Sequence, residues 1–153
     1  MKETDRSCFR LRELALCIES DGSAVRRVFR VDGALPEERP DAVTEQAKRE
    51  LEAYFFGKLT AFSVPIRPDG TAFQKRVWQA LRMIPFGETR SYAEIAKAAG
   101  HPGAARATGQ AIGANPILIL IPCHRVIRGD GGLGGFSAGI DLKRRLLELE
   151  KRD

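Results

Sequence analysis

Hydrophobic residues in the first part of the chain follow two different periods. Over residues 9–18 they alternate with other side chains in the two-residue period of β-strands. Asp21-Gly22 is a hairpin turn signal, and the partner strand is predicted at residues 25–31. Over residues 43–55 the apolar positions recur at helical spacing before a glycine. The pattern predicts a small α+β unit.

Helical periods dominate from residue 71 onward. Thr71 and Gln74 fit a capping box, and an apolar stripe at helical spacing follows until Pro85. Ser91 and Glu94 fit a second capping box, which starts another short helix. The sequence therefore predicts two helices in this stretch, separated by a turn.

Further segments complete the second part of the chain. A third helix is predicted over about residues 103–113, with Pro102 in its first turn. The short apolar run at residues 117–121 is interpreted as a buried strand. A glycine-rich loop covers residues 129–139, and a final helix with one apolar face begins at Ile140.

Proline content and charge both mark a boundary between the two parts. Two prolines and a glycine crowd into residues 65–70, which we interpret as a connector. The first 70 residues carry 12 Lys+Arg against 13 Asp+Glu, whereas the remainder carries 13 against 7. We expect an N-terminal α+β domain over residues 1–64 and a basic C-terminal domain over residues 71–153, the part suited to a polyanion such as DNA.

Cysteine usage and hydropathy favour a cytoplasmic protein. Cys8, Cys17 and Cys123 are an odd, sparse set that predicts no disulfide framework and suits a reducing compartment. No apolar run approaches the ~20 residues of a membrane span, and the N-terminus has no signal-peptide pattern. The cysteines lack the short spacing of a zinc site, and no phosphate-binding or dinucleotide fingerprint is present. We expect no metal, no cofactor and no membrane contact.

The two short helices around Gly100 have helix-turn-helix spacing. On spacing alone, a packed helical hairpin without nucleic acid explains them equally well. The second helix is rich in Ala and Gly around Arg106, and a small-residue surface lets a helix approach a groove while an arginine enters the base stack. Tyr92, at the start of the first helix, can press on a nucleotide. A solvated Arg106 and a merely packed Tyr92 are the competing interpretations.

The sharpest chemical feature is the tetrapeptide Pro-Cys-His-Arg at residues 122–125. A cysteine beside apolar residues is more often an inert buried thiol than a nucleophile. His124 argues for a nucleophile, because it can take the proton of Cys123 directly or through a water, and Arg125 adds positive charge. A carboxylate would then orient His124. The candidate carboxylates are Glu148, Glu150 and Asp141.

The order of these motifs resembles the O6-alkylguanine-DNA alkyltransferases, or methylated-DNA–protein-cysteine methyltransferases. The matching stretches are residues 70–78, 84–92, 104–116, 121–127 and 143–150. They cover nearly all of the second half, and Pro-Cys-His-Arg in that setting is highly specific. The resemblance implies an α+β protein with a small ribonuclease H-like N-terminal domain and a helical, winged-helix-like C-terminal domain that carries the helix-turn-helix.

The same resemblance implies direct-reversal DNA repair without a cofactor. A monomer would bind double-stranded DNA from the minor groove and flip an O6-alkylguanine out of the stack. The alkyl group would then move to Cys123 in a single turnover, with O4-alkylthymine as a poorer substrate. A thiolate is a soft, strong nucleophile, which suits displacement at an alkyl carbon.

Catalytic roles follow from the resemblance residue by residue. Glu150 would polarise His124, which would act through a water to deprotonate Cys123. Asn115, by itself an ordinary turn residue, would hold the turn that positions the active-site strand. Tyr92 would help to rotate the target nucleotide and would protonate the guanine as it leaves.

Other residues would contact the DNA. Arg106 would fill the gap that the flipped base leaves in the stack. Ser137, together with the main chain around Cys123 and Val126, would bind the flipped base. The remaining predicted DNA contacts are Ser91, Ala105 and Arg125.

Two departures and three alternatives qualify the resemblance. Phe136 stands where many family members have Tyr, and Ala138 replaces a frequent Gly, both in the loop expected to wall the base pocket. A non-catalytic binder of alkylated DNA would lack the acceptor thiol, but Cys123 is present. A cysteine hydrolase would need an oxyanion hole and leaves the basic half unexplained. A helix-turn-helix regulator would need dimer symmetry, and the sequence has no evident dimerisation segment.

Overall fold

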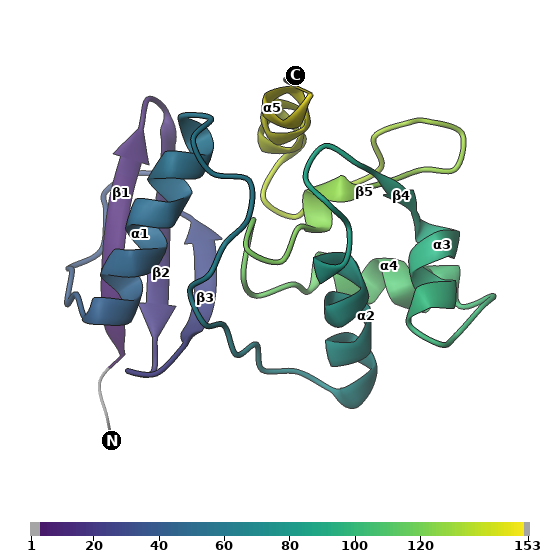
Figure 1. Ribbon diagram of the computed structural model, residues 1–153, viewed down its shortest axis with the longest axis horizontal. Coiled ribbons are helices and arrows are strands. Elements are labelled where there is room, and N and C mark those ends of the chain that lie inside the picture. The colour runs from purple at the N-terminus through teal and green to yellow at the C-terminus, as the bar shows by residue number, and fades with distance from the viewer. Residues whose placement is uncertain (1–3, 152–153) are drawn as a thin grey trace. The chain divides into compact units, whose positions relative to one another are not determined.

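The computed structural model describes residues 4–151 of the chain. They form a mixed α/β structure with five α-helices, a three-stranded antiparallel sheet and a two-stranded sheet (Figure 1). The chain divides into two compact units, Met1–Asp69 and Gly70–Asp153. The division falls within the residues that proline content and charge mark as a connector.

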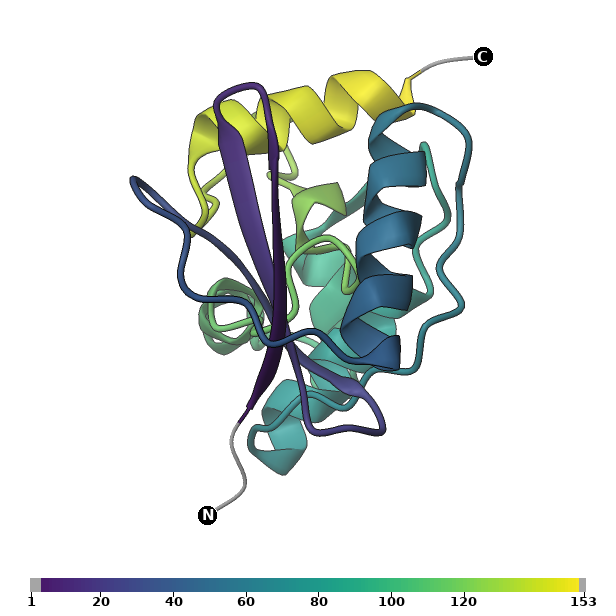
Figure 2. The same cartoon turned by 90° about the vertical axis from the view of Figure 1, so that its left-hand side faces the viewer.

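The N-terminal unit is an antiparallel meander with one helix. Its strands are β1 (Asp5–Leu11), β2 (Leu14–Ser20) and β3 (Val25–Arg30), in that order across the sheet. Helix α1 (Ala42–Phe55) lies along one face of the sheet (Figures 1 and 2). The strands and the helix that the two periods predict are confirmed. β2 is buried at every position because it is the central strand.

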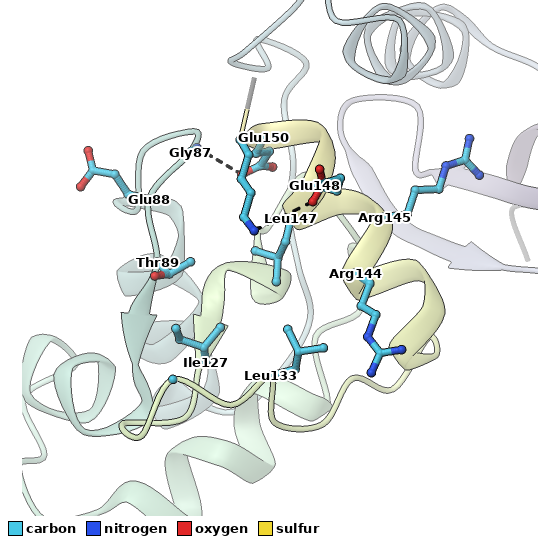
Figure 3. A pocket seen from close by; sticks show the side chains of 12 residues that line it. Gly87, Glu88, Thr89, Ile127, Leu133, Arg144, Arg145, Leu147, Glu148 and Glu150 are labelled. Atoms are coloured by element: carbon cyan, nitrogen blue, oxygen red, sulfur yellow. Dashed lines mark hydrogen bonds and ion pairs between the residues drawn. The ribbon is translucent and has the colours of Figure 1, made fainter. Parts of the chain in front are cut away.

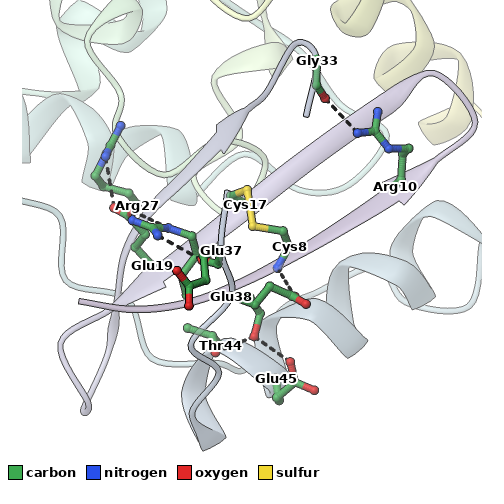
Figure 4. Close-up of a disulfide and its surroundings, with 12 residues drawn as sticks. Cys8, Arg10, Cys17, Glu19, Arg27, Gly33, Glu37, Glu38, Thr44 and Glu45 are labelled. Carbon is green, nitrogen blue, oxygen red and sulfur yellow. Dashed lines mark hydrogen bonds and ion pairs between the residues drawn. A yellow bond between two sulfur atoms is a disulfide. The ribbon is translucent and has the colours of Figure 1, made fainter. Parts of the chain in front are cut away.

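A disulfide joins Cys8 of β1 to Cys17 of β2 (Figure 4). The cysteine count predicted no disulfide, and that prediction is wrong for this pair, so cysteine usage no longer supports a reducing compartment. A two-residue turn, in which Arg12 has a φ of 56°, sets a register with Cys8 directly opposite Cys17. The Cys8 N–H donates to Glu38 at 2.7 Å, which makes this a non-hydrogen-bonded pair, where facing side chains lie closest.

The C-terminal unit is mainly helical (Figure 1). Its elements are α2 (Ala72–Arg82), β4 (Arg90–Ser91), α3 (Tyr92–Ala98), α4 (Ala105–Gly113), the 3₁₀ helix η1 (Cys123–Arg125), β5 (Val126–Ile127) and α5 (Ile140–Glu150). The side chains of Thr71 and Ser91 each accept from the backbone three residues on, so both predicted capping boxes are confirmed. α4 begins at Ala105, later than predicted, and Pro102 lies in the turn before it.

Residues 117–121 form a buried turn, and the predicted strand is wrong. All five side chains are buried, but Ile119 has a φ of 71°, and Leu118 forms a bridge with Ile121 inside the turn. A short apolar run reports burial and does not distinguish a strand from a compact turn. Cys123 consequently begins a 3₁₀ helix instead of ending a strand.

A short parallel ladder connects the helix-turn-helix to the cysteine turn. β4 pairs with β5, with Arg90 opposite Val126 and Ser91 opposite Ile127. α3 starts directly after β4, and β5 directly follows η1. The ladder therefore fixes the start of α3 relative to the residues that follow Cys123.

Candidate active site

A hydrogen-bonded turn presents Cys123. The Asn115 side chain donates to the Ile121 carbonyl and accepts from the Ile117 N–H, both at 2.9 Å. The Cys123 N–H donates to the Ile121 carbonyl at 2.8 Å, and the cysteine is 3% exposed. Asn115 thus closes the turn that leads into η1. The family resemblance implied a turn that leads into a strand.

His124, the neighbour of Cys123, forms a buried pair with Glu150. The distance from His124 Nε2 to Glu150 Oε2 is 2.6 Å, and the two residues are 0% and 4% exposed. Glu148 and Asp141, the other carboxylates that the sequence left open, are exposed on α5. Of the three, Glu150 is the carboxylate that lies against His124.

The second ring nitrogen of His124 has no hydrogen-bond partner among residues 4–151. Burial lowers the pKa of His124; the hydrogen bond and charge of Glu150 oppose that shift, and the charges of Arg125 and Lys143 add to it. The net shift favours the neutral imidazole, with its proton on Nε2 toward Glu150. Nδ1 is then an acceptor, which is the state that a general base requires.

The thiol of Cys123 is protonated at neutral pH. Burial raises its pKa to about 11, although the Asn115 side chain and the charge of Lys143 act in the opposite direction. Since a thiolate is the nucleophilic form of cysteine, this site needs a base close to the sulfur. His124, the next residue in the chain, is the candidate for such a base.

Lys143 is a buried cation that sequence reasoning missed. Its Nζ donates to the carbonyls of Val126 at 2.7 Å, Gly135 at 3.2 Å and Leu133. These bonds tie α5 both to β5 and to the glycine-rich loop. Helical spacing could have indicated Lys143, because it lies seven residues before Glu150 and therefore shares one face of α5 with it.

Tyr92 lies between α4 and the glycine-rich loop. A Cβ at Gly109 would meet its ring at 3.7 Å, and a Cβ at Gly134 would lie 2.8 Å from its hydroxyl. Gly134 also has a φ of 71°, so any other residue there would be strained and would displace the hydroxyl. Burial raises the pKa of Tyr92, against a hydrogen bond with the Gly135 backbone, and the charge of Cys123 also raises it. The Tyr92 hydroxyl therefore stays protonated and within electrostatic reach of the thiol.

Of the residues predicted to contact DNA, three are exposed to solvent and one caps a helix. Arg106 and Ala105 are exposed on α4, and Ser137 is exposed in the glycine-rich loop. The Ser91 hydroxyl accepts from the Glu94 N–H and so caps α3. Over residues 4–151, no hydrogen bond or ion pair is found between either Ser137 or Arg106 and the buried cluster around Cys123.

The side chains of Arg125 and Val126 are both buried. Arg125 is 6% exposed, and its guanidinium is bound to Glu150 and to the Ile84 carbonyl. The side chain of Val126 is buried, and its carbonyl accepts from Lys143. Each nitrogen of the Arg125 guanidinium thus faces a protein acceptor, and its predicted DNA contact stays a prediction.

A groove of about 770 Å³ lies beside the helix that carries Glu150 (Figure 3). Leu133 and Leu147 line it, and the Gly87 N–H donates to Glu150 Oε1 at 3.3 Å along its wall. Cys123 is not among its lining residues. The groove therefore borders the end of α5 at Glu150, and the thiol does not line it.

Residues 4–151 contain neither a metal-ion cluster nor a membrane-spanning helix. No group of three His, Cys, Asp or Glu side chains in that range is arranged to hold a metal ion. No helix in the same range has the length and hydropathy of a membrane span. Cys8 and Cys17, which lack zinc spacing, form a disulfide.

Comparison with known sequences identifies the family. Residues 72–152, more than half of the chain, match the family model described as 6-O-methylguanine DNA methyltransferase, DNA binding domain. The methylated-DNA–protein-cysteine methyltransferase of Methanosarcina acetivorans is 47% identical over 141 residues, which cover 88% of this chain and 90% of that protein.

Solved structures agree with the sequence match. A crystal structure of Mycobacterium tuberculosis O6-methylguanine methyltransferase has a TM-score of 0.87 at 44% identity, covering 97% of this chain and 93% of that one. The structure of Mycobacterium tuberculosis OGT in complex with DNA has a TM-score of 0.87 at 46% identity, covering 96% and 92%. The chain belongs to the methylated-DNA–protein-cysteine methyltransferase family.

The turn before Cys123 is expected to depend on Asn115. N115A removes two hydrogen bonds, so we expect it to lower the free energy of unfolding by about 2–4 kcal/mol, and N115D, which keeps the acceptor, by about half as much. Urea unfolding measures both changes. The exposed Gln110 supplies a control, since Q110A should stay within about 0.5 kcal/mol of the wild type. An equally small effect of N115A would contradict the role assigned to the turn.

Proposed function

We propose that this protein repairs alkylated DNA by direct reversal, transferring the alkyl group from O6 of guanine to Cys123 once per molecule. Membership of the family and similarity to a DNA-bound structure support a DNA substrate. The observation that carries the proposal is a set of three buried side chains. They are the thiol of Cys123, the neutral imidazole of His124 and the carboxylate of Glu150.

The reaction is a displacement at the alkyl carbon. His124 Nδ1 takes the proton of the Cys123 thiol through a water, and Glu150 stabilises the imidazolium. The sulfur bonds to the alkyl carbon while the carbon–O6 bond breaks, and that electron pair stays with guanine. Tyr92 protonates the leaving guanine and regains a proton from His124 through solvent, so charge balances. The thioether does not release the thiol, which limits the protein to one turnover.

The helix-turn-helix of α3 and α4 delivers the target base. A base atom inside the stack cannot be attacked in line, so the nucleotide must first be flipped out. Arg106, exposed on α4, fills the gap in the stack, and the small exposed Ala105 allows close approach to the minor groove. Ser91, at the start of α3, contacts the DNA backbone. The excess positive charge after residue 70 supports phosphate contacts by a single protein molecule.

The glycine-rich loop forms the pocket for the flipped base. Ser137 and the main chain around Cys123 and Val126 bind the base, with O6-alkylguanine preferred to O4-alkylthymine. Phe136 and Ala138 lie in the same loop and wall the pocket. These two side chains would then set how large an alkyl group the site accepts.

We further propose that the two units are domains, with residues 1–64 and 71–153 joined by a connector at 65–70. The meander with one packed helix supports a ribonuclease H-like N-terminal domain. The α3–α4 pair with the β4–β5 ladder supports a winged-helix-like C-terminal domain. The reaction balances with protein side chains and DNA alone, so it needs no cofactor. Because a DNA substrate requires access to DNA inside the cell, we assign the protein to the cytoplasm.

Mass spectrometry tests the transfer. After incubation with a duplex oligonucleotide that carries one O6-methylguanine, we expect the intact protein to gain one methyl group, on the peptide containing Cys123, in stoichiometric amount. C123A removes the acceptor and should abolish the gain while DNA binding persists.

Three outcomes would contradict this function. Methyl transfer to the C123A protein would contradict the mechanism. No methyl gain by the wild type with the oligonucleotide still bound would point to a non-catalytic binder. No gain and no binding would favour a cysteine hydrolase of small molecules.

Arg106 is expected to matter only in duplex DNA. R106A leaves the gap in the stack unfilled, so we expect repair of an O6-methylguanine duplex to slow by about tenfold or more. Reaction with the free alkylated base, followed in the same protein, should not change. R82M, at an exposed arginine of α2, is the matched control. Equal slowing by R106A on both substrates would count against the stack-filling role.

A further inference from the structure

We propose that Arg125 is a positioning residue for the transfer: it holds the Glu150 carboxylate in place and balances its charge, so that His124 rests as a neutral base. The inference rests on the proposed alkyl transfer to Cys123. It assigns Arg125 an internal role that Pro-Cys-His-Arg, taken as a sequence motif, does not reveal.

The guanidinium of Arg125 donates hydrogen bonds to the Glu150 carboxylate from two of its nitrogens. Arg125 Nε lies 2.8 Å from Glu150 Oε1, and Nη2 lies 3.0 Å from Oε2. The third nitrogen, Nη1, donates to the Ile84 carbonyl at 2.7 Å. A planar fork of this kind fixes the orientation of a carboxylate as well as its distance. Arg125 thereby links three segments of the C-terminal unit: η1, the end of α5 and the residues after α2.

Glu150 needs such an anchor because of its place in the helix. It is the last residue of α5, where the helix dipole disfavours a negative charge and where helical ends fray. The bond that it makes to His124 Nε2 must nevertheless stay at 2.6 Å for the ring to remain oriented. Arg125 supplies a buried positive charge and two directed bonds at that helix end.

Arg125 also contributes to the resting charge of His124. The charged groups that act on the imidazole are Glu150 and Lys143 from α5 and Arg125 from its own turn. A buried imidazole beside an isolated carboxylate would be held as the imidazolium, which cannot accept a proton. With Arg125 bound to the same carboxylate, burial prevails and the pKa of His124 is lowered. The guanidinium therefore acts together with burial to keep Nδ1 available as an acceptor.

Two substitutions separate charge from geometry. R125M removes the positive charge and keeps an apolar side chain, whereas R125K keeps the charge but offers a point contact in place of the fork. The reaction rate of each protein with a free alkylated guanine is measured from about pH 5 to 9, which isolates chemistry from DNA binding. The matched control is R82M, an exposed arginine on α2. Circular dichroism and thermal unfolding report whether each variant is folded.

The expected pH profiles differ between the variants. In R125M the acid limb of the rate–pH profile moves to higher pH, because His124 is now held protonated. The rate near pH 7 therefore falls by about tenfold or more and recovers near pH 9. In R125K the acid limb keeps the wild-type position, and the rate is lower by about threefold to tenfold at every pH. R82M should match the wild type.

A double variant tests whether the charge of Glu150 causes the shift expected in R125M. R125M/E150Q removes both charges, so its acid limb should return to the wild-type position even though its rate stays low. If R125M does not fold while the double variant does, the buried charge of Glu150 is what Arg125 balances, which supports the proposal.

An unshifted acid limb in folded R125M would overturn the charge role, and a wild-type rate in R125K would overturn the positioning role. If R125M and the double variant both fail to fold, Arg125 is a packing residue and the charge role is abandoned. Methyl transfer by the wild type in the same assay tests the proposed function separately.

Discussion

The carboxylate of Glu150 is the interaction on which the rest of the site depends. One oxygen meets His124 at 2.6 Å, and both oxygens meet the guanidinium of Arg125. A carboxylate buried to this degree is tolerated only when it is paired and hydrogen-bonded. Arg125 meets that requirement and leaves His124 neutral. The end of α5 is thereby part of the chemistry around Cys123 as well as of the packing.

The surrounding scaffold holds the thiol and its base at fixed places. Asn115 closes the turn before Cys123, and Lys143 ties α5 to β5 and to the glycine-rich loop. The β4–β5 ladder joins that loop region to the start of α3, where Tyr92 lies against Gly134. The helix-turn-helix proposed to bind DNA is thus connected, through one short backbone ladder, to the residues that would perform the transfer. Pre-organisation of this kind is what a single-turnover reaction on a flipped base requires.

Local signals could be predicted from the sequence, and contacts between distant segments could not. Capping boxes, strand alternation and the helix-turn-helix spacing each depend on residues within one turn or strand, and the structure contains them. The turn at residues 117–121 was mistaken for a strand because apolarity alone does not encode φ. The Cys8–Cys17 bond and the burial of Arg125 depend on hairpin register and on a partner 25 residues away, respectively. The family resemblance named Glu150, which spacing alone could not separate from its neighbours on α5.

The protonation state of His124 tests the central claim most directly. Nitrogen-15 chemical shifts of the imidazole ring, recorded on the ¹⁵N-labelled wild-type protein near neutral pH, distinguish the neutral tautomers from the imidazolium. The account predicts a neutral ring that carries its proton on Nε2, facing Glu150, with Nδ1 unprotonated. An imidazolium, or a neutral ring protonated on Nδ1, would contradict it, because neither form could take the proton of Cys123.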